Sequence, residues 1–289
     1  MWTDQTPLFQ GSRCKEAPTP FRMKSPKSKP SRHASPVQLS EPAMPTGEDN
    51  SVLIVGVYLP TIANHADSIS ADLLGARRWR VDLRWAAIGE GPVPELVRDH
   101  TALALASPVP KYALLNRLLA GIELDRYRYI IVIDDDIEIG PTFLDRFLEL
   151  QTTYDLALAQ PARTHDSYID HYFVAQLLGV AARWTRFVEI GPVFSLRRDA
   201  FPHILPFNEE APMGWGLDFV WPVQLEAKGC RLGIVDAAPV KHALRKPVTT
   251  YDYGETDTEM SRFLAERKHL ARDDAFIAIE TYPLHPQST

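Results

Sequence analysis

Cysteine is nearly absent from this sequence, which excludes two structural classes. Only Cys14 and Cys230 occur among the 289 residues, far apart and in unlike surroundings, so neither a disulfide framework nor a thiolate metal site is supported. Long apolar runs are also missing, and the N-terminus lacks the charged-then-apolar order of a secretory signal. We therefore expect a soluble chain in a reducing, cytoplasmic compartment, without a transmembrane segment.

An excess of basic charge is found only in the N-terminal region. Lysine and arginine cluster between Arg13 and Arg32 against the single acid Glu16, while the formal net charge of the whole chain is −6. The remainder is thus acidic and a poor binder of nucleic acid. Residues 1–50 are rich in Pro, Ser, Lys and Thr, which predicts a disordered tail before one domain at 51–289. The basic stretch suggests weak contact with a membrane surface, with a solvated tail as the alternative.

The most informative stretch joins an apolar strand to three carboxylates. Tyr129–Ile133 has the composition of a strand buried on both faces, and Asp134, Asp135 and Asp136 follow it directly. Adjacent carboxylates repel one another and resist burial, so they require a cation or strong hydrogen bonding. Mg²⁺ and Mn²⁺ prefer carboxylate oxygens, and ligands of open α/β sheets gather at the carboxyl ends of strands. The stretch predicts a metal-phosphate site; a solvated acidic turn capping the next helix is the alternative.

Hydrophobic periodicity around this stretch favours an α/β fold. A strand, a helix and a second strand open the domain, which is typical of a parallel, doubly wound sheet. The expected strands are Ser51–Pro60, Trp79–Ile88, Tyr129–Ile133, Leu156–Gln160, Val188–Leu196 and Arg231–Val235. The expected helices are Asn64–Leu74, Lys111–Ile122, one opened by Gly140 and Pro141, one ending at Lys228, and a last one begun by a capping box at Thr256 and Glu259. Ala237–Tyr253 reads mostly as loop.

Several motifs occur in the order used by GT-A glycosyltransferases. Lys111-x-x-x-x-Asn116 before a strand ending in Asp-x-Asp resembles the nucleotide-sugar half of that fold. The stretches YIIVIDDDI, ALAQPA, VEIGPVFS, GWGLDF and GIVDAAPVKH also resemble a family of bacterial and plant proteins catalogued as a domain of unknown function and thought to be GT-A-like. The resemblance covers about Ser51 to Tyr253. It implies a Rossmann-like, mostly parallel central sheet flanked by helices.

The same resemblance implies a donor site for a nucleoside diphosphate sugar. Asp136 would bind Mn²⁺ or Mg²⁺, Asp134 would face the ribose or the hydrated metal, and His242 would complete the metal site. The implied donor-binding residues are Lys111, Asn116, Asp134, Asp135, Arg245 and Lys246. Lys111 and Asn116 are about 140° apart on a regular helix, so a shared contact requires Lys111 to precede the helix. An ordinary loop histidine and a solvated lysine are the alternatives.

Asp218, after a Gly-Trp-Gly turn, matches the carboxylate with which inverting members of that fold take the proton of a hydroxyl acceptor. It is our candidate general base, and a carboxylate that favours the helix N-terminus is the compatible structural reading. The implied function is metal-dependent transfer of a sugar to a carbohydrate or other hydroxyl acceptor. If Asp218 is not the base, a retaining reaction remains open.

Three other functions compete with this interpretation. A metal-dependent hydrolase would draw on His165, Asp166, Asp170 and His171, although their spacing does not match a zincin motif. A sugar nucleotidyltransferase would require a Gly-rich basic loop after the first strand, which the sequence lacks. A non-catalytic carbohydrate-binding or nucleotide-binding protein would keep the fold without turnover, and the joint presence of the acidic triplet, Asp218 and His242 counts against it.

Overall fold

A computed structural model describes residues 50–245 and 253–284 of the chain. The expected tail therefore lies outside the described residues apart from Asn50. The strands are β1 (Ser51–Tyr58), β2 (Arg80–Ile88), β3 (Thr101–Leu105), β4 (Tyr129–Asp134), β5 (Ile137–Glu138), β6 (Leu156–Arg163), β7 (Val180–Thr185), β8 (Val193–Arg197), β9 (Arg231–His242) and β10 (Ala278–Pro283). Within the described ranges, no helix is long and apolar enough to span a bilayer.

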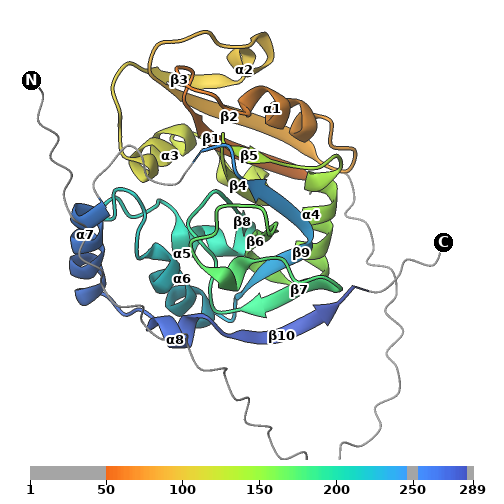
Figure 1. The fold of residues 1–289 in the computed structure, drawn as a ribbon, viewed down its shortest axis with the longest axis vertical. Helices are drawn as coiled ribbons and strands as arrows, with labels where there is room; N and C mark the ends of the chain where they lie inside the picture. Colours follow the sequence, from red (N-terminus) through yellow and green to blue (C-terminus); the bar gives the residue numbers. More distant parts are fainter. Residues whose placement is uncertain (1–49, 246–252, 285–289) are drawn as a thin grey trace, which may run out of the picture. The chain divides into compact units, whose positions relative to one another are not determined.

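Nine of these strands form a mixed sheet in the order β10-β7-β9-β6-β8-β4-β1-β2-β3, and β5 pairs with β9 off this path (Figure 1). β1 pairs in parallel with β2 and β4, β2 with β3, and β6 with β9. β8 runs antiparallel between β4 and β6, and β7 runs antiparallel between β9 and β10. The strands are thus mostly parallel, which confirms the expected fold class.

Helices cover both faces of the sheet (Figure 1). They are α1 (Ala66–Leu74), α2 (Glu95–Asp99), α3 (Lys111–Leu119), α4 (Phe143–Thr153), α5 (Phe201–Ile204), α6 (Leu217–Glu226), α7 (Tyr253–Ala265) and α8 (Arg272–Ala275). Alternate residues of β1 and β4 face opposite cores. One core packs against α1 and α4, and the other against α3, α5 and α6. This alternation explains the continuous apolar runs of both strands, since each face is buried.

Four expectations about local structure are corrected. β9 continues to His242, because Val240 pairs with Arg163 of β6 and the last two residues pair with β5. Ala237–His242 is therefore strand and not loop. α7 begins at Tyr253, which places Thr256 inside the helix and not at its cap. α4 begins at Phe143, after Pro141 and a left-handed Thr142 with φ 64°. In the stretch expected as a strand from Val188, only Val193 onward forms one.

Candidate functional site

The acidic triplet lies at the carboxyl end of β4, in the middle of the sheet. The five apolar residues of β4 are fully buried, and Asp134 ends the strand with its backbone N–H donated to the carbonyl of Pro192 at 2.9 Å. β8 runs antiparallel to β4, so the chain that enters β8 passes directly beside the triplet. The three carboxylates have different partners, and the site is built from those partners.

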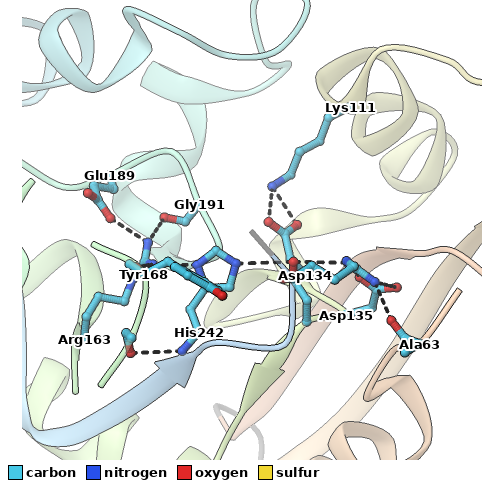
Figure 2. A network of polar contacts seen from close by, with 12 residues as sticks. Ala63, Lys111, Asp134, Asp135, Arg163, Tyr168, Glu189, Gly191 and His242 are labelled. Atoms are coloured by element: carbon cyan, nitrogen blue, oxygen red, sulfur yellow. Dashed lines mark hydrogen bonds and ion pairs between the residues drawn. The ribbon is translucent and has the colours of Figure 1, made fainter. Parts of the chain in front are cut away.

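Asp134 is paired with Lys111. The Lys111 ammonium lies 2.7 Å from Oδ2 and 2.6 Å from Oδ1 of Asp134, with both side chains partly exposed (Figure 2). Lys111 is the first residue of α3, following Pro110, and does not precede the helix as a contact shared with Asn116 would require. Gly191 leaves room for this pair, because a Cβ there would lie 3.2 Å from the ammonium and 3.3 Å from Oδ2.

Asp135 points into the protein. Its side chain is buried, its Oδ2 accepts the backbone N–H of Leu59 at 2.9 Å, and both its oxygens face the guanidinium of Arg245. Arg245 in turn donates to the carbonyl of Ala63 at 2.9 Å. Burial raises the pKa of Asp135, and the hydrogen bond and charge of Arg245 offset part of that rise. The middle carboxylate therefore anchors the loop after β1 and holds Arg245 in place.

Asp136 faces His242 at the end of β9. Nε2 of His242 lies 3.3 Å from Oδ2 of Asp136, and a nitrogen of Arg245 lies 3.2 Å from the same oxygen. Burial opposes ionisation of Asp136. The hydrogen bond from His242 and the charges of Arg245 and Lys111 outweigh burial, so the pKa of Asp136 lies below its ordinary value. Asp136 is thus an anion at neutral pH.

A buried arginine contacts the ring nitrogen of His242 that points away from Asp136. Arg163, at the end of β6, has one guanidinium nitrogen 2.9 Å from Nδ1 of His242, while the other donates to Glu189 at 2.6 Å and to the carbonyl of Gly191 at 2.7 Å (Figure 2). Arginine can only donate. Nδ1 of His242 must therefore be the acceptor, and the proton of a neutral ring sits on Nε2, facing Asp136.

This arrangement tests the predicted metal site at Asp134, Asp136 and His242. A histidine that binds a metal normally donates its other ring N–H to an acceptor. Nδ1 of His242 instead accepts a hydrogen bond from Arg163, so in the neutral ring Nε2 carries the hydrogen where a ligand needs a lone pair. Both oxygens of Asp134 face Lys111, and no three His, Cys, Asp or Glu side chains in the described part of the chain are grouped to hold an ion. The predicted donor set does not fit a resident divalent metal.

A second pair of carboxylates lies on the α6 side. Asp218, the second residue of α6, is 7% exposed, and Glu189, in the loop before β8, is 5% exposed. Burial, followed by the charge of Glu189, raises the pKa of Asp218 to about 7. Burial also raises the pKa of Glu189 to about 7, against the opposing charge of Arg163. Trp215, just before α6, is partly exposed.

Some predicted residues do not join these groups. The Asn116 amide bonds both the carbonyl and the N–H of Phe207 and also Glu209, which makes it a support for the loop after α5. Lys246 lies outside the described residues. The proposed hydrolase cluster is divided, because Asp166 bonds Thr164 whereas His171 packs against aromatic rings.

Arg163 and Glu189 are site residues that the sequence reasoning missed. Each is a charged residue inside or beside an otherwise apolar stretch of sequence. Arg163 lies at the end of β6, and Glu189 lies shortly before β8. Buried charges are retained only where they are paired. Both side chains would have qualified as candidates on that ground.

Comparison with known proteins gives fold relatives only. The sequence matches no protein-family model and no curated protein. Among solved structures, GalNAc-T7 with UDP, GalNAc and Mn²⁺ is similar at 11% identity and a TM-score of 0.50, over 72% of this chain and 47% of that one. S. aureus TarS 1–349 with UDP-GlcNAc is similar at 11% identity and a TM-score of 0.50, over 75% of this chain and 66% of that one. This chain thus spans about half of the first and just under two thirds of the second, and its fold is that of the GT-A glycosyltransferases.

Proposed function

We propose that this chain is a glycosyltransferase that moves a sugar from a nucleoside diphosphate to a hydroxyl acceptor. The observation that carries the proposal is the placement of two carboxylate groups on a GT-A fold. The triplet with Lys111 and Arg245 lies at the end of β4, and the buried Asp218 begins α6. Both fold neighbours are described with uridine nucleotides, so UDP is the first donor to test.

On the donor side, the side chains that can meet the diphosphate are cationic. The Lys111 ammonium and the Arg245 guanidinium are both partly exposed, and they contact different members of the triplet, Lys111 the first and Arg245 the second and third. Ammonium and guanidinium groups form charge-assisted hydrogen bonds with phosphate oxygens, and they stabilise the charge that develops on a departing diphosphate. Asp134 and Asp136 hold these cations in place and offer acceptors for ribose hydroxyl groups.

Manganese enters the proposal only as a condition to be tested. GalNAc-T7 is described with Mn²⁺, and the sequence motif predicts the same ion here. The protonated Nε2 of His242 and the pairing of Asp134 with Lys111 oppose that prediction. We therefore assign the neutralisation of phosphate charge to Lys111 and Arg245.

On the acceptor side, Asp218 is the proposed general base. A base works best when its pKa lies near the working pH, and burial places the pKa of Asp218 at about 7. In an inverting displacement, the acceptor hydroxyl gives its proton to Asp218 while its oxygen bonds the anomeric carbon. The bond from that carbon to the diphosphate breaks, and its electron pair leaves on the nucleotide.

Thermal shift with UDP, GDP, CDP and ADP, each in Mn²⁺ and in EDTA, tests the donor half. A ligand at a hundred times its Kd adds about 2.7 kcal/mol, a rise of a few degrees in Tm for a chain of this size. Lys111→Met should remove most of the rise, whereas Lys228→Met, an exposed lysine after α6, should retain it. No rise with any nucleotide would refute the proposal.

Turnover tests the acceptor half. We expect Asp218→Asn to keep the nucleotide-induced rise in Tm and to lose hydrolysis or transfer of the matching nucleotide sugar by 10²-fold or more, on the order of the contribution of a general base. Full turnover in that variant would refute the assignment of the base. Binding without turnover in the unsubstituted chain would instead favour the non-catalytic alternative.

A further inference from the structure

Arg163 is a buried arginine whose contacts reach three segments around the site. Its side chain is 3% exposed, and one guanidinium nitrogen lies 2.6 Å from Oε2 of Glu189 and 2.7 Å from the carbonyl of Gly191. The other nitrogen lies 2.9 Å from Nδ1 of His242 and 3.4 Å from the carbonyl of Tyr168 (Figure 2). Glu189 compensates the buried positive charge. The guanidinium is therefore held in one orientation, with a donor directed at the ring of His242.

The backbone of His242 is held on both sides at the end of β9. Its N–H donates to the hydroxyl of Ser167 at 3.0 Å, and its carbonyl accepts the N–H of Tyr168 at 2.7 Å. The residue also pairs with β5 and is 9% exposed. With its backbone fixed in this way, the ring presents Nδ1 to Arg163 and Nε2 to Asp136.

These contacts leave one choice of neutral tautomer for His242. Nδ1 accepts from Arg163, so the single ring proton lies on Nε2, which is 3.3 Å from Oδ2 of Asp136. An N–H group facing a carboxylate is attractive. The other tautomer would set a lone pair of Nε2 against the carboxylate, and two facing acceptors repel unless a proton or a metal cation lies between them. Arg163 therefore determines whether His242 and Asp136 form a closed hydrogen bond or a cation site.

We propose that Arg163 is a positioning residue that keeps the donor site free of a resident metal, by holding His242 as an N–H donor toward Asp136. This inference rests on the proposed function, in which Lys111 and Arg245 meet the charge of the diphosphate. Arg163 acts through His242 and is itself too buried to meet the substrate. Asp136 stays the partner of Arg245, whose nitrogen lies 3.2 Å from the same oxygen. The substrate is then a nucleoside diphosphate sugar that binds without a bridging cation.

Arg163→Gln tests the proposal by a gain of metal binding. Without the guanidinium donor, Nδ1 of His242 is free to carry the ring proton, and Nε2 then turns a lone pair toward Asp136. Imidazole nitrogen and carboxylate oxygen are ligands that Mn²⁺ accepts. The partner on the far nitrogen of a metal-binding histidine is worth about 10–100-fold in metal affinity. We therefore expect Mn²⁺ alone, in calorimetric titration, to bind Arg163→Gln about 10–100-fold more tightly than the unsubstituted chain.

Arg163→Lys and Ser167→Ala are the matched controls. Lysine keeps a donor and a positive charge behind His242, so Arg163→Lys should bind Mn²⁺ as weakly as the unsubstituted chain. Ser167→Ala removes the hydroxyl that accepts from the backbone of His242 and leaves Arg163 in place, so it loosens the same residue without freeing Nδ1. A purely structural role for Arg163 would lower Tm in Arg163→Gln without changing the affinity for Mn²⁺. Equal affinities in the folded Arg163→Gln variant and the unsubstituted chain overturn the proposal.

The ring of His242 provides a second measurement that does not depend on whether Arg163→Gln folds. In the unsubstituted chain with ¹⁵N-labelled histidine, at a pH where the ring is neutral, Nε2 should be protonated and Nδ1 unprotonated; His242→Gln assigns the two resonances. The opposite tautomer, or binding of Mn²⁺ by the unsubstituted chain as tight as in Arg163→Gln, overturns the proposal. Neither measurement requires a nucleotide. If no nucleotide raises Tm, the proposed function fails, and the tautomer and the Mn²⁺ titration still decide the role of Arg163.

Discussion

Asp135→Asn is expected to destabilise the protein far more than the same change at either neighbouring carboxylate. Asp135 is 2% exposed, and its oxygens accept from the backbone N–H of Leu59 and from Arg245. Asparagine has the same shape, but only one of its two terminal atoms is an acceptor oxygen. Its other terminal group is an NH₂ donor, which would face the N–H donors of Arg245. The substitution thus leaves a buried donor unsatisfied and removes the anion from a buried ion pair.

The structure sets the size of this effect. An unsatisfied buried group costs about 1–3 kcal/mol, and loss of one partner of a fully buried pair costs about 3–5 kcal/mol. The Arg245 side chain is 21% exposed, which reduces the second contribution. We therefore expect a loss of about 3 kcal/mol, or a fall in Tm of roughly 6–12 °C at 2–4 °C per kcal/mol.

Asp134→Asn is the matched control, measured by thermal and urea unfolding of the same chain. The pair of Asp134 with Lys111 has side chains 26% and 18% exposed, so its loss should cost about 1 kcal/mol or less. The control should instead weaken the nucleotide-induced rise in Tm. Equal Tm values for the two variants would refute the view that the middle carboxylate is a structural anchor.

Three further outcomes are expected. Replacing Mn²⁺ by EDTA should leave the nucleotide-induced rise in Tm unchanged, because His242 presents N–H to its neighbouring carboxylate; a rise seen only with Mn²⁺ and lost in His242→Ala would contradict this. Arg183→Met should lower the free energy of unfolding in urea by about 3–5 kcal/mol, because its ion pair with Asp236 is buried, whereas Arg186→Met should lower it by about 1 kcal/mol or less, because its ion pair with Glu226 is partly exposed. Similar losses in the two variants would contradict the burial argument. Gly214→Ala should lower Tm well beyond Gly229→Ala, because both have positive φ but only the first lies against an aromatic ring; an equal fall would show that the ring moves freely.

The central strands were predictable because their sequences fit a buried strand and no other element. β1 and β4 are buried on both faces, and continuous β-branched runs of that length do not suit another element. β10 was not predicted, because it is mostly exposed and pairs only with β7 in the described sheet. The second half of β9 was missed because Pro239 reads as a break. Pro239 is tolerated where β9 has passed its last pair with β7, at Val235, and has not yet resumed pairing at Val240.

The candidate site was predictable only in part. The triplet, Asp218 and His242 follow from short motifs and their resemblance to known glycosyltransferases. Arg163 and Glu189 do not, because the contacts that define them join residues 79 and 26 positions apart. Local periodicity reports which face of a strand is buried, and it carries no information about which distant segment meets that face. The fit of His242 to a metal was not readable from the sequence either, since the tautomer of its ring depends on Arg163.

β9 connects the interior of the sheet to the edge of the site without a loop between them. Its early residues pair with β6 and β7, and its last two residues pair with β5, with His242 opposite Ile137 and Lys241 opposite Glu138. Side chains alternate along a strand, so the gain of one residue after Val235 would place Lys241, and the loss of one would place Ala243, where His242 now lies. Natural variants of this chain should therefore accept amino-acid replacements between Asp236 and Val240 much more readily than single-codon insertions or deletions, even though the segment contains the small residues and proline typical of a tolerant loop.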